Sequence, residues 1–395
     1  MGSNQVGMRQ FNERVVLQAI RLNGALPKAD VARITRLSTQ TASVIIDNLL
    51  RDKLVVKQAR VRGRIGQPSV PIALNRDGAF TLGIKVGRRS LDVLALDFVG
   101  DIRYRESLEY AYPNPDTIFG AIEQQLNALK SALGSHADRL VGVGVAAPLW
   151  LGGWREFLGA PKGAMNAWQG VDIRARIQSM THLPVEFSKD TTAACVAELV
   201  MGQGRTLQHF LYLFIGTFVG GGIVIDSHLY PGPRGNAGAV GSVPLALENA
   251  TTPDQLLHKA SGLSLEHKLR RLRAPAAAAH DERALSPRLR PATDEWLAEA
   301  CPALALTITS ATALLDIDAV VIDGSMHRGL VENIVHQTGR VLDNYNWEGL
   351  HRPRLITGSI GANARALGGA LLPLHSHFAP NREHFLKPES AVASR

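Results

Sequence analysis

A run of small polar residues near the N-terminus has the side-chain types that recognise DNA bases by hydrogen bonding. Thr39, Gln40, Thr41 and Ser43 open a segment whose later apolar residues recur at helical spacing. Amide side chains pair with adenine in the major groove, and threonine methyl groups meet thymine methyl groups. We therefore expect these four residues to contact base edges. A helix cap with a solvent-facing first turn is the alternative interpretation of the same residues.

A second segment could bind the DNA backbone. Arg60, Arg62 and Arg64 alternate with other residues, and Gln67 follows them. Side chains alternate in an extended chain, so the three guanidinium groups fall on one side. Together with the β-type run at residues 54–56, this segment is typical of a basic wing that contacts phosphates or a narrow minor groove.

Helices must position these residues. Apolar spacing predicts a helix over about residues 8–23, a short helix after Pro27, and a third helix capped by Ser38 or Thr39. A short helix, a tight turn and a longer helix form a helix-turn-helix, whose second helix enters the major groove. With the basic hairpin, residues 1–76 are predicted to form a winged helix-turn-helix domain.

The distribution of charge supports this assignment. Residues 1–66 carry twelve Lys and Arg against four Asp and Glu, whereas the remainder holds 31 of each. All the net charge of +8 therefore belongs to the N-terminal segment, as expected for a module that binds a polyanion. A solvated basic face is the alternative.

Composition excludes several other classes. The chain has 395 residues and 45% hydrophobic content, which is typical of a globular protein with more than one domain. No uninterrupted apolar run reaches the roughly 18 residues of a membrane span, and no secretion signal is present. Two distant cysteines and unclustered histidines predict neither a disulfide framework nor a metal site. We expect a cytoplasmic protein with no cofactor.

The rest of the chain, residues 77–395, alternates strand-like and helical segments, which predicts an α/β fold with two lobes. Strands are expected at residues 82–87, 91–97, 141–145, 211–215, 222–225 and 319–322, and a helix at 116–133. Residues 274–293 are rich in Ala, Pro and Arg and are interpreted as a surface excursion or an irregular connector rather than core.

Several motifs in this part resemble the ROK family of repressors and sugar kinases. They are LGIKVG (82–87), VGVGVAAP (141–148), KDTTAA (189–194), IGTFVGGG (215–222), GNAG (235–238), IDGS (322–325) and GANARALGGA (361–370). The resemblance implies an actin-like ATPase fold with a ligand site between its lobes. A winged helix-turn-helix ahead of this domain is the architecture of the family's regulators.

The chain departs from the kinases of this family at their phosphate loops. Lys85 stands where an acidic residue organises Mg²⁺, Arg88 and Arg89 replace Gly-Thr, and Phe218 replaces a loop glycine. A lysine cannot ligate Mg²⁺, and phosphoryl transfer depends on that metal. The family's zinc-binding cysteine stretch is also absent. The resemblance therefore implies a regulator that has lost kinase activity.

The resemblance also implies effector-binding positions. Ala239 and Ser242 stand where the family has a sugar-binding Glu and His, and Lys189 and Lys162 stand where it has Asn. The remaining predicted contacts are Trp168, Asp190, Gly216 and Thr217. Asp190 has three interpretations: a ligand contact, a helix cap, or the general base of a kinase. Trp168 could stack on a sugar or simply pack in the core.

We therefore expect a sequence-specific regulator, more readily a repressor than an activator, of carbohydrate-related genes. Its partners are expected to be double-stranded DNA with a palindromic operator and a small, sugar-derived effector. A homodimer or homotetramer follows from the palindrome. The alternatives are an ATP-dependent sugar kinase that uses Asp190 as its base, and a regulator whose large domain only dimerises.

Overall fold

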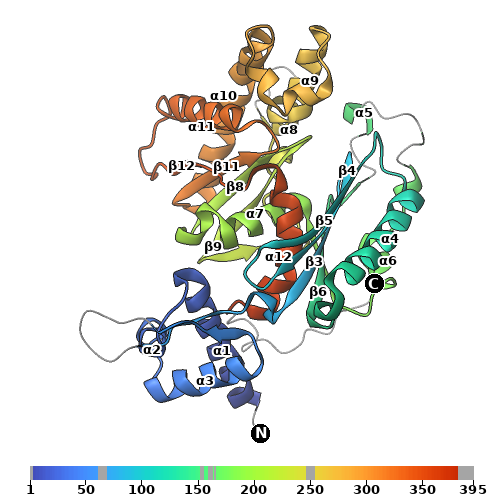
Figure 1. Cartoon of the computed structure of the whole chain (residues 1–395). Helices are drawn as coiled ribbons and strands as arrows, with labels where there is room; N and C mark the ends of the chain where they lie inside the picture. Colours follow the sequence, from blue (N-terminus) through green and yellow to red (C-terminus); the bar gives the residue numbers. More distant parts are fainter. Residues whose placement is uncertain are drawn as a thin grey trace.

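In the computed structural model, the described part of the chain comprises residues 3–60, 69–151, 155–158, 163, 166–245 and 254–380. Its N-terminal end is a small helical head that lies below two sheet-containing lobes (Figure 1). The head contains α1 (Ser3–Asn23), α2 (Lys28–Thr35) and α3 (Thr39–Arg51), followed by the antiparallel strands β1 (Val55–Lys57) and β2 (Ile72–Leu74). Three helices and a two-stranded ribbon are the elements predicted for this segment.

The head folds around a compact apolar core. Val16, Ile20, Val31, Ile46 and Leu49 are all buried, and they occupy one face of each helix. This is the helical periodicity that the sequence shows. The backbone of Leu26 exchanges two hydrogen bonds with Ile72, which anchors the β2 end of the ribbon to the chain between α1 and α2.

The first lobe is a five-stranded sheet of order β5-β4-β3-β6-β7. Its strands are β3 (Phe80–Val86), β4 (Ser90–Asp97), β5 (Ile102–Glu109), β6 (Leu140–Ala147) and β7 (Val185–Lys189). The helices α4 (Pro115–Leu133), α5 (Arg155–Leu158) and α6 (Ile173–Gln178) belong to this lobe, and α4 buries Ile122, Leu126 and Leu129.

The second lobe repeats this plan with the order β10-β9-β8-β11-β12. Its strands are β8 (Phe210–Ile215), β9 (Val219–Ile225), β10 (His228–Tyr230), β11 (Ala319–Gly324) and β12 (Arg354–Thr357). The helices α8 (Leu256–Ala260), α9 (Gly262–Arg271), α10 (Arg290–Leu315) and α11 (Arg328–Leu342) complete it. The predicted α/β fold with two lobes is confirmed.

Two helices join the lobes: α7 (Asp190–Met201) and α12 (Ala364–Phe378). They cross between the sheets (Figure 1), and glycines let them approach closely. A Cβ atom at Gly368 of α12 would lie 1.7 Å from the carbonyl oxygen of Ala193 in α7, and a Cβ atom at Gly144 of β6 would lie 1.8 Å from that of Gly369 in α12. Backbone therefore packs on backbone at this crossing.

The expectation that residues 274–293 form a surface excursion or an irregular connector rather than core was wrong about burial. This segment forms two short 3₁₀ helices, Ala276–Ala279 and Glu282–Leu285, and then enters α10. Ala278, Ala279 and Ala284 are fully buried in the core of the second lobe, where Trp296 is also buried. Their small side chains let the backbone pack directly against the neighbouring helices, which composition alone does not reveal.

One described helix, α10, is long and apolar enough to cross a bilayer by length and composition. Half of that apolar stretch is buried inside the second lobe. Core helices have the same composition, and the buried side chains of Leu297, Leu304 and Ile308 place α10 among them.

Candidate functional site

The predicted DNA-contacting residues lie at the start of α3. Ser38 is its N-cap, and its hydroxyl accepts a hydrogen bond of 3.1 Å from the amide of Thr41. Thr39, Gln40 and Thr41 are exposed on the first turn. The hydroxyl of Thr41 also lies 2.8 Å from that of Ser38, so Thr41 shares in the cap. Thr39 and Gln40 are the residues most open to an approaching surface.

Ser43 and Arg60 have different surroundings. Ser43 is half-buried and accepts a hydrogen bond of 3.1 Å from Lys28, which also pairs with Asp47 at 2.7 Å. Lys28 thus fixes α2 against α3. Arg60 is exposed after β1, whereas Arg62, Arg64 and Gln67 lie outside the described residues. The wing contacts stay predictions.

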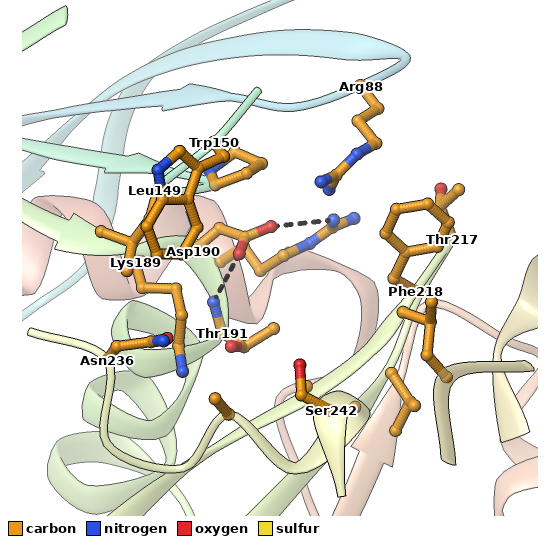
Figure 2. Close-up of a pocket in the computed structure, with 17 residues that line it drawn as sticks. Arg88, Leu149, Trp150, Lys189, Asp190, Thr191, Thr217, Phe218, Asn236 and Ser242 are labelled. Carbon is orange, nitrogen blue, oxygen red and sulfur yellow. Dashed lines mark hydrogen bonds and ion pairs between the residues drawn. The ribbon is translucent and has the colours of Figure 1, made fainter. Parts of the chain in front are cut away.

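A pocket lies where three turns of the body meet: the β3–β4 turn, the junction of β7 and α7, and the β8–β9 turn (Figure 2). Its volume is about 150 Å³. Five of the predicted effector residues line it, namely Lys189, Asp190, Thr217, Ala239 and Ser242.

Three predicted effector residues are not in this lining. Gly216 lies behind it, where its amide donates to the carbonyl of Phe218 at 3.2 Å. Trp168 is buried in the wall of a neighbouring cavity, and its indole donates to the carbonyl of Pro113 at 2.9 Å. This geometry agrees with the packing interpretation of Trp168. Lys162 lies outside the described residues.

Positive charge dominates the pocket among its described residues. Arg88, Lys189 and Arg365 line it together with one carboxylate, that of Asp190. Asp190 is the first residue of α7, its Oδ1 accepts from the amide of Thr191 at 2.9 Å, and its Oδ2 lies 3.7 Å from Arg365 (Figure 2). The same carboxylate thus caps the helix backbone and faces the cavity.

The two arginines reach the pocket with incomplete hydrogen bonding. The guanidinium of Arg88 lies 4.3 Å from the ring centroid of Phe218, and that of Arg365 lies 5.1 Å from the ring of Phe214. In both residues the Nε atom is buried and has no hydrogen-bond partner. Burial lowers the pKa of Arg88 to about 10, so this guanidinium is charged at neutral pH.

Two lysines of this region are buried. Lys189 donates to the carbonyl of Ala237 at 3.0 Å, and burial lowers its pKa to about 8. Lys85 forms an ion pair with Asp92 at 2.9 Å, and burial lowers its pKa to about 8 as well. Burial alone would raise the pKa of Asp92, but Lys85 and Ser107 lower it on balance. Lys85 is therefore engaged inside its own lobe.

An ion pair connects the lobes beside the pocket. Arg89, in the β3–β4 turn, donates to both oxygens of Glu266 on α9, at 2.7 and 3.0 Å. His280 lies 3.1 Å from the same carboxylate. Burial would raise the pKa of Glu266, but His280 and Arg89 lower it on balance. The Arg89–Glu266 pair thus links the β3–β4 turn to α9, and the Arg88–Phe218 contact links the same turn to the β8–β9 turn.

The sequence did not indicate that Arg88, Asn236 and Arg365 line the pocket. Arg365 belongs to the GANARALGGA motif, but nothing in a glycine- and alanine-rich helix indicates which face meets the pocket. No group of three His, Cys, Asp or Glu suited to a metal ion occurs within the described ranges.

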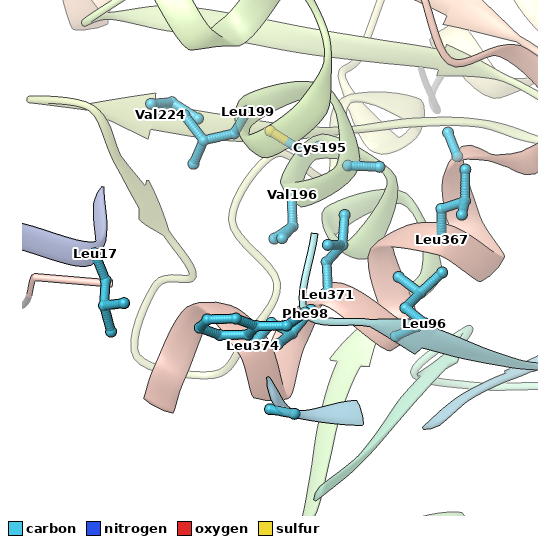
Figure 3. Close-up of a cluster of buried hydrophobic side chains, with 14 of the residues drawn as sticks. Leu17, Leu96, Phe98, Cys195, Val196, Leu199, Val224, Leu367, Leu371 and Leu374 are labelled. Carbon is cyan, nitrogen blue, oxygen red and sulfur yellow. The ribbon is translucent and has the colours of Figure 1, made fainter. Parts of the chain in front are cut away.

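The head is packed against the body at a junction far from the pocket. Leu17 and Ile20 of α1 belong to the same buried cluster as Phe98, which follows β4, and Leu374 of α12 (Figure 3). The guanidinium of Arg21 lies 5.1 Å from the ring centroid of Phe98. On the other side, Arg205 donates to the carbonyl of Leu22 at 3.1 Å.

Comparison with known proteins agrees with this architecture. The chain is 21% identical over 243 residues to the xylose repressor of Bacillus subtilis, a match that covers 62% of each protein. The chain thus spans about three fifths of the length of this relative.

Two solved structures have the same fold. One is a ROK family transcriptional regulator described as a homologue of the E. coli MLC protein, with a TM-score of 0.71 and 18% identity over 94% of this chain and 97% of that one. The other is a ROK hexokinase from Thermus thermophilus, with a TM-score of 0.55 and 21% identity over 74% and 97% of the two chains.

The kinase match covers less of the chain than the regulator match does. The profile of the ROK family itself matches residues 81–375, which is most of the two-lobed body and includes every described residue of the pocket. The chain belongs to the ROK family.

Proposed function

We propose that this protein is a sequence-specific DNA-binding transcriptional regulator, acting as a repressor, whose two-lobed body binds a small effector. The observation that supports this proposal most directly is the charge and the exposed residues of the head. The head holds the whole excess of positive charge and exposes Thr39 and Gln40 on the capped first turn of α3. Basic charge attracts the phosphate backbone without regard to sequence, and small polar side chains at the start of a recognition helix distinguish bases.

The names of similar proteins support this proposal. One relative is a xylose repressor, and one protein of the same fold is a transcriptional regulator. By this analogy, the regulated genes concern carbohydrates and the protein acts in the cytoplasm. A homodimer or homotetramer on a palindromic operator follows from the two-fold symmetry of such sites.

Kinase activity is proposed to be lost, because side chains occupy the positions that phosphate and metal need. The ammonium of Lys85 is paired with Asp92 where an acidic residue would hold Mg²⁺. Arg88 and Phe218 fill the space between the two turns. The amide of Gly216 already donates to Phe218, so it is not available to a phosphate oxygen.

The proposal is tested by a mobility-shift assay on the DNA upstream of the protein's own gene and its neighbours, with and without a panel of sugars and sugar derivatives. We expect a shift that survives competitor DNA at physiological salt and is released by one compound. Binding that is indifferent to sequence at this salt concentration would contradict a specific regulator.

The variant Gln40→Ala identifies the recognition helix in the same assay. Loss of a bidentate contact to a base costs about 1–3 kcal/mol, so affinity for the operator falls about 5- to 150-fold, while non-specific binding is unchanged. Gln124→Ala on the exposed face of α4 is the matched control. Equal loss of specific and non-specific binding in Gln40→Ala would indicate that Gln40 does not read bases.

The second candidate, an ATP-dependent sugar kinase, rests on Asp190, which lines the pocket at the position of a kinase base. It predicts ATP turnover with a hexose that disappears in Asp190→Asn. We expect no turnover above background in either protein.

A further inference from the structure

We propose that the pocket binds an anionic effector, a small compound that carries a carboxylate or phosphate group, in preference to a neutral sugar. This inference rests on the proposed function, because it names the chemical class of the effector in the same pocket. It is argued from charge balance, from unused hydrogen-bond donors and from the size of the cavity.

The charge balance separates the pocket from the surrounding cleft. Lys85 has its own carboxylate in Asp92, and Arg89 has its own in Glu266. In contrast, Arg88, Lys189 and Arg365 share Asp190, whose nearest charged contact is Arg365 at 3.7 Å. Arg88 has no ion pair within the described part of the chain. Buried charge is costly unless it is paired, so the pocket lacks negative charge that a ligand can supply.

Hydrogen-bond donors point to the same chemistry. The Nε atoms of Arg88 and Arg365 are buried without an acceptor, and a buried unsatisfied donor is unfavourable. A carboxylate or phosphate offers several acceptor oxygens and binds guanidinium groups with paired, charge-assisted hydrogen bonds. The hydroxyl groups of a neutral sugar accept weaker bonds and bring no compensating charge.

Further features of the pocket support an anion. Lys189, Asp190 and Thr191 at the beginning of α7 line it, and the N-terminus of a helix carries partial positive charge. In Figure 2 the Lys189 ammonium lies beside Asn236, on the other side of Asp190 from Arg88. An anion between these groups would be within reach of cations from two directions.

The size and the remaining walls restrict the ligand further. A cavity of about 150 Å³ is of the size that holds one six-membered ring. Thr217, Ser242 and Asn236 contribute uncharged polar groups to its walls, which suit hydroxyl groups. The expected effector is therefore a hydroxylated acid or a phosphorylated compound of about monosaccharide size.

Binding of matched probes to the full-length protein tests this inference by calorimetry and thermal shift, without DNA. D-xylose, D-glucose, D-glucuronate and D-glucose 6-phosphate have the same ring stereochemistry and differ in the group attached to carbon 5. The galactose series, together with acetate and inorganic phosphate, covers other stereochemistry and the minimal anions. We expect at least one charged probe to bind at least tenfold more tightly than its neutral counterpart, and its affinity to fall as salt is raised.

Three variants assign the binding to the pocket. Arg88→Gln and Lys189→Gln each lower the affinity for that probe at least tenfold, because each removes a charge from the pocket. Arg340→Gln, on the exposed face of α11, is the matched control and leaves the affinity unchanged. Thermal unfolding of each variant shows whether it is folded. Whether D-glucuronate or D-glucose 6-phosphate binds more tightly shows whether the pocket prefers a carboxylate or a phosphate group.

The inference is overturned if the neutral sugars bind as tightly as their charged counterparts, if no charged probe binds, or if Arg88→Gln binds like the parent protein. These outcomes are separate from the test of the proposed function. Release of operator DNA by a neutral sugar leaves the regulator intact and removes the anionic effector. If the protein binds an anion but no specific DNA site, the anion-binding pocket stands and the proposed regulator is contradicted.

Discussion

Lys189 is a charged side chain that the pocket keeps at a cost in stability. Its side chain is almost fully buried, and its ammonium has one carbonyl acceptor and no carboxylate closer than 4 Å in the described structure. Transfer of a charge out of water is unfavourable, and the lowered pKa of about 8 expresses this cost. A residue kept under these conditions is more easily explained by a ligand than by the fold.

We predict that Lys189→Met increases the free energy of unfolding at pH 7 by about 1 kcal/mol while it abolishes anion binding. The pKa of Lys189 in the folded state, about 8, lies below the ordinary lysine value of 10.5. Between these values the unfolded chain binds more protons than the folded one, so the parent protein gains stability as pH rises through this window.

The Lys189→Met variant lacks this gain, so its advantage over the parent shrinks from pH 8 to pH 10.5 in chemical denaturation. Lys130→Met, at an exposed position of α4, is the control and should show no such pH dependence. A lower stability of Lys189→Met at pH 7 would contradict the prediction and make Lys189 a structural residue.

At the level of elements, the crossing of α7 and α12 sets the position of the pocket. Asp190 begins α7 and Arg365 lies in the first turn of α12, so the distance between the helices fixes their ion pair. Glycine makes this close approach feasible, because Gly368 of α12 meets the backbone of Ala193 directly.

Two neighbouring glycines of α12 provide a matched test. In Gly368→Ala the new Cβ would lie 1.7 Å from a backbone oxygen, so the helices must separate, and we expect a loss of about 3 kcal/mol or more in the free energy of unfolding. In Gly369→Ala the nearest atom is 3.4 Å away, and alanine favours the helix, so stability is unchanged or slightly higher.

Both changes have the same effect on helix propensity, so the difference in the free energy of unfolding between the two variants reports the packing at the helix crossing. Denaturant unfolding measures this difference. Equal stabilities of the two variants would show that α7 and α12 can move apart at little cost. The crossing would then not fix the distance between Asp190 and Arg365.

Elements with a strong apolar pattern could be predicted from the sequence. Elements without such a pattern, and residues whose burial depends on distant partners, could not. β3, β4, β6 and β8 are apolar strands, and their existence was evident. β5 was missed because this edge strand is mostly exposed and rich in charge, with Arg103, Arg105 and Glu106 in its middle. Residues 274–293 were misjudged because small alanines are buried only through the neighbours that surround them.

The candidate site divides in the same way. Motif order indicated Lys189, Asp190 and Thr217 because strand ends and turns gather at one edge of each lobe. Arg365 comes from a helix whose rotation was unknown. Trp168 was expected either to contact a ligand or to pack in the core, and its burial beside Phe119 agrees with packing. The side-chain type of a tryptophan does not distinguish packing from stacking on a ligand.

At the scale of the whole molecule, the lobes are held together by a partly buried ion pair. We predict that Arg89→Ala lowers the free energy of unfolding by about 2 kcal/mol, because it leaves the fully buried carboxylate of Glu266 with only His280 as a partner. Arg89 is itself 37% exposed, so the loss is smaller than for a fully buried pair.

Arg283→Ala removes a comparable guanidinium from an exposed pair with Asp281, and it should have little effect. Chemical denaturation of both variants measures the contrast. If the two variants are equally stable, the Arg89–Glu266 pair does not hold the lobes together.

The head and the body share one buried apolar cluster. α1 and α12 lie on either side of the cluster that contains Leu17, Phe98 and Leu374, so a movement of α12 reaches the head directly. Because the first turn of the same helix carries Arg365 at the pocket, α12 extends from the pocket to the junction with the head. Such a connection is a route for regulation only if both ligands change its equilibrium.

Loosening the junction should therefore separate the head from the body. In Arg21→Ala/Arg205→Ala the stacking on Phe98 and the hydrogen bond to Leu22 are both lost. We expect faster backbone hydrogen exchange throughout α1–α3, while peptides of the body exchange at the parent's rate, because the free energy of local opening falls only in the head. Arg33→Ala/Arg36→Ala, on exposed positions of the head, is the matched control. Unchanged exchange in α1 would mean that the apolar cluster alone fixes the head, and transmission through α12 would then depend on Leu17 and Phe98.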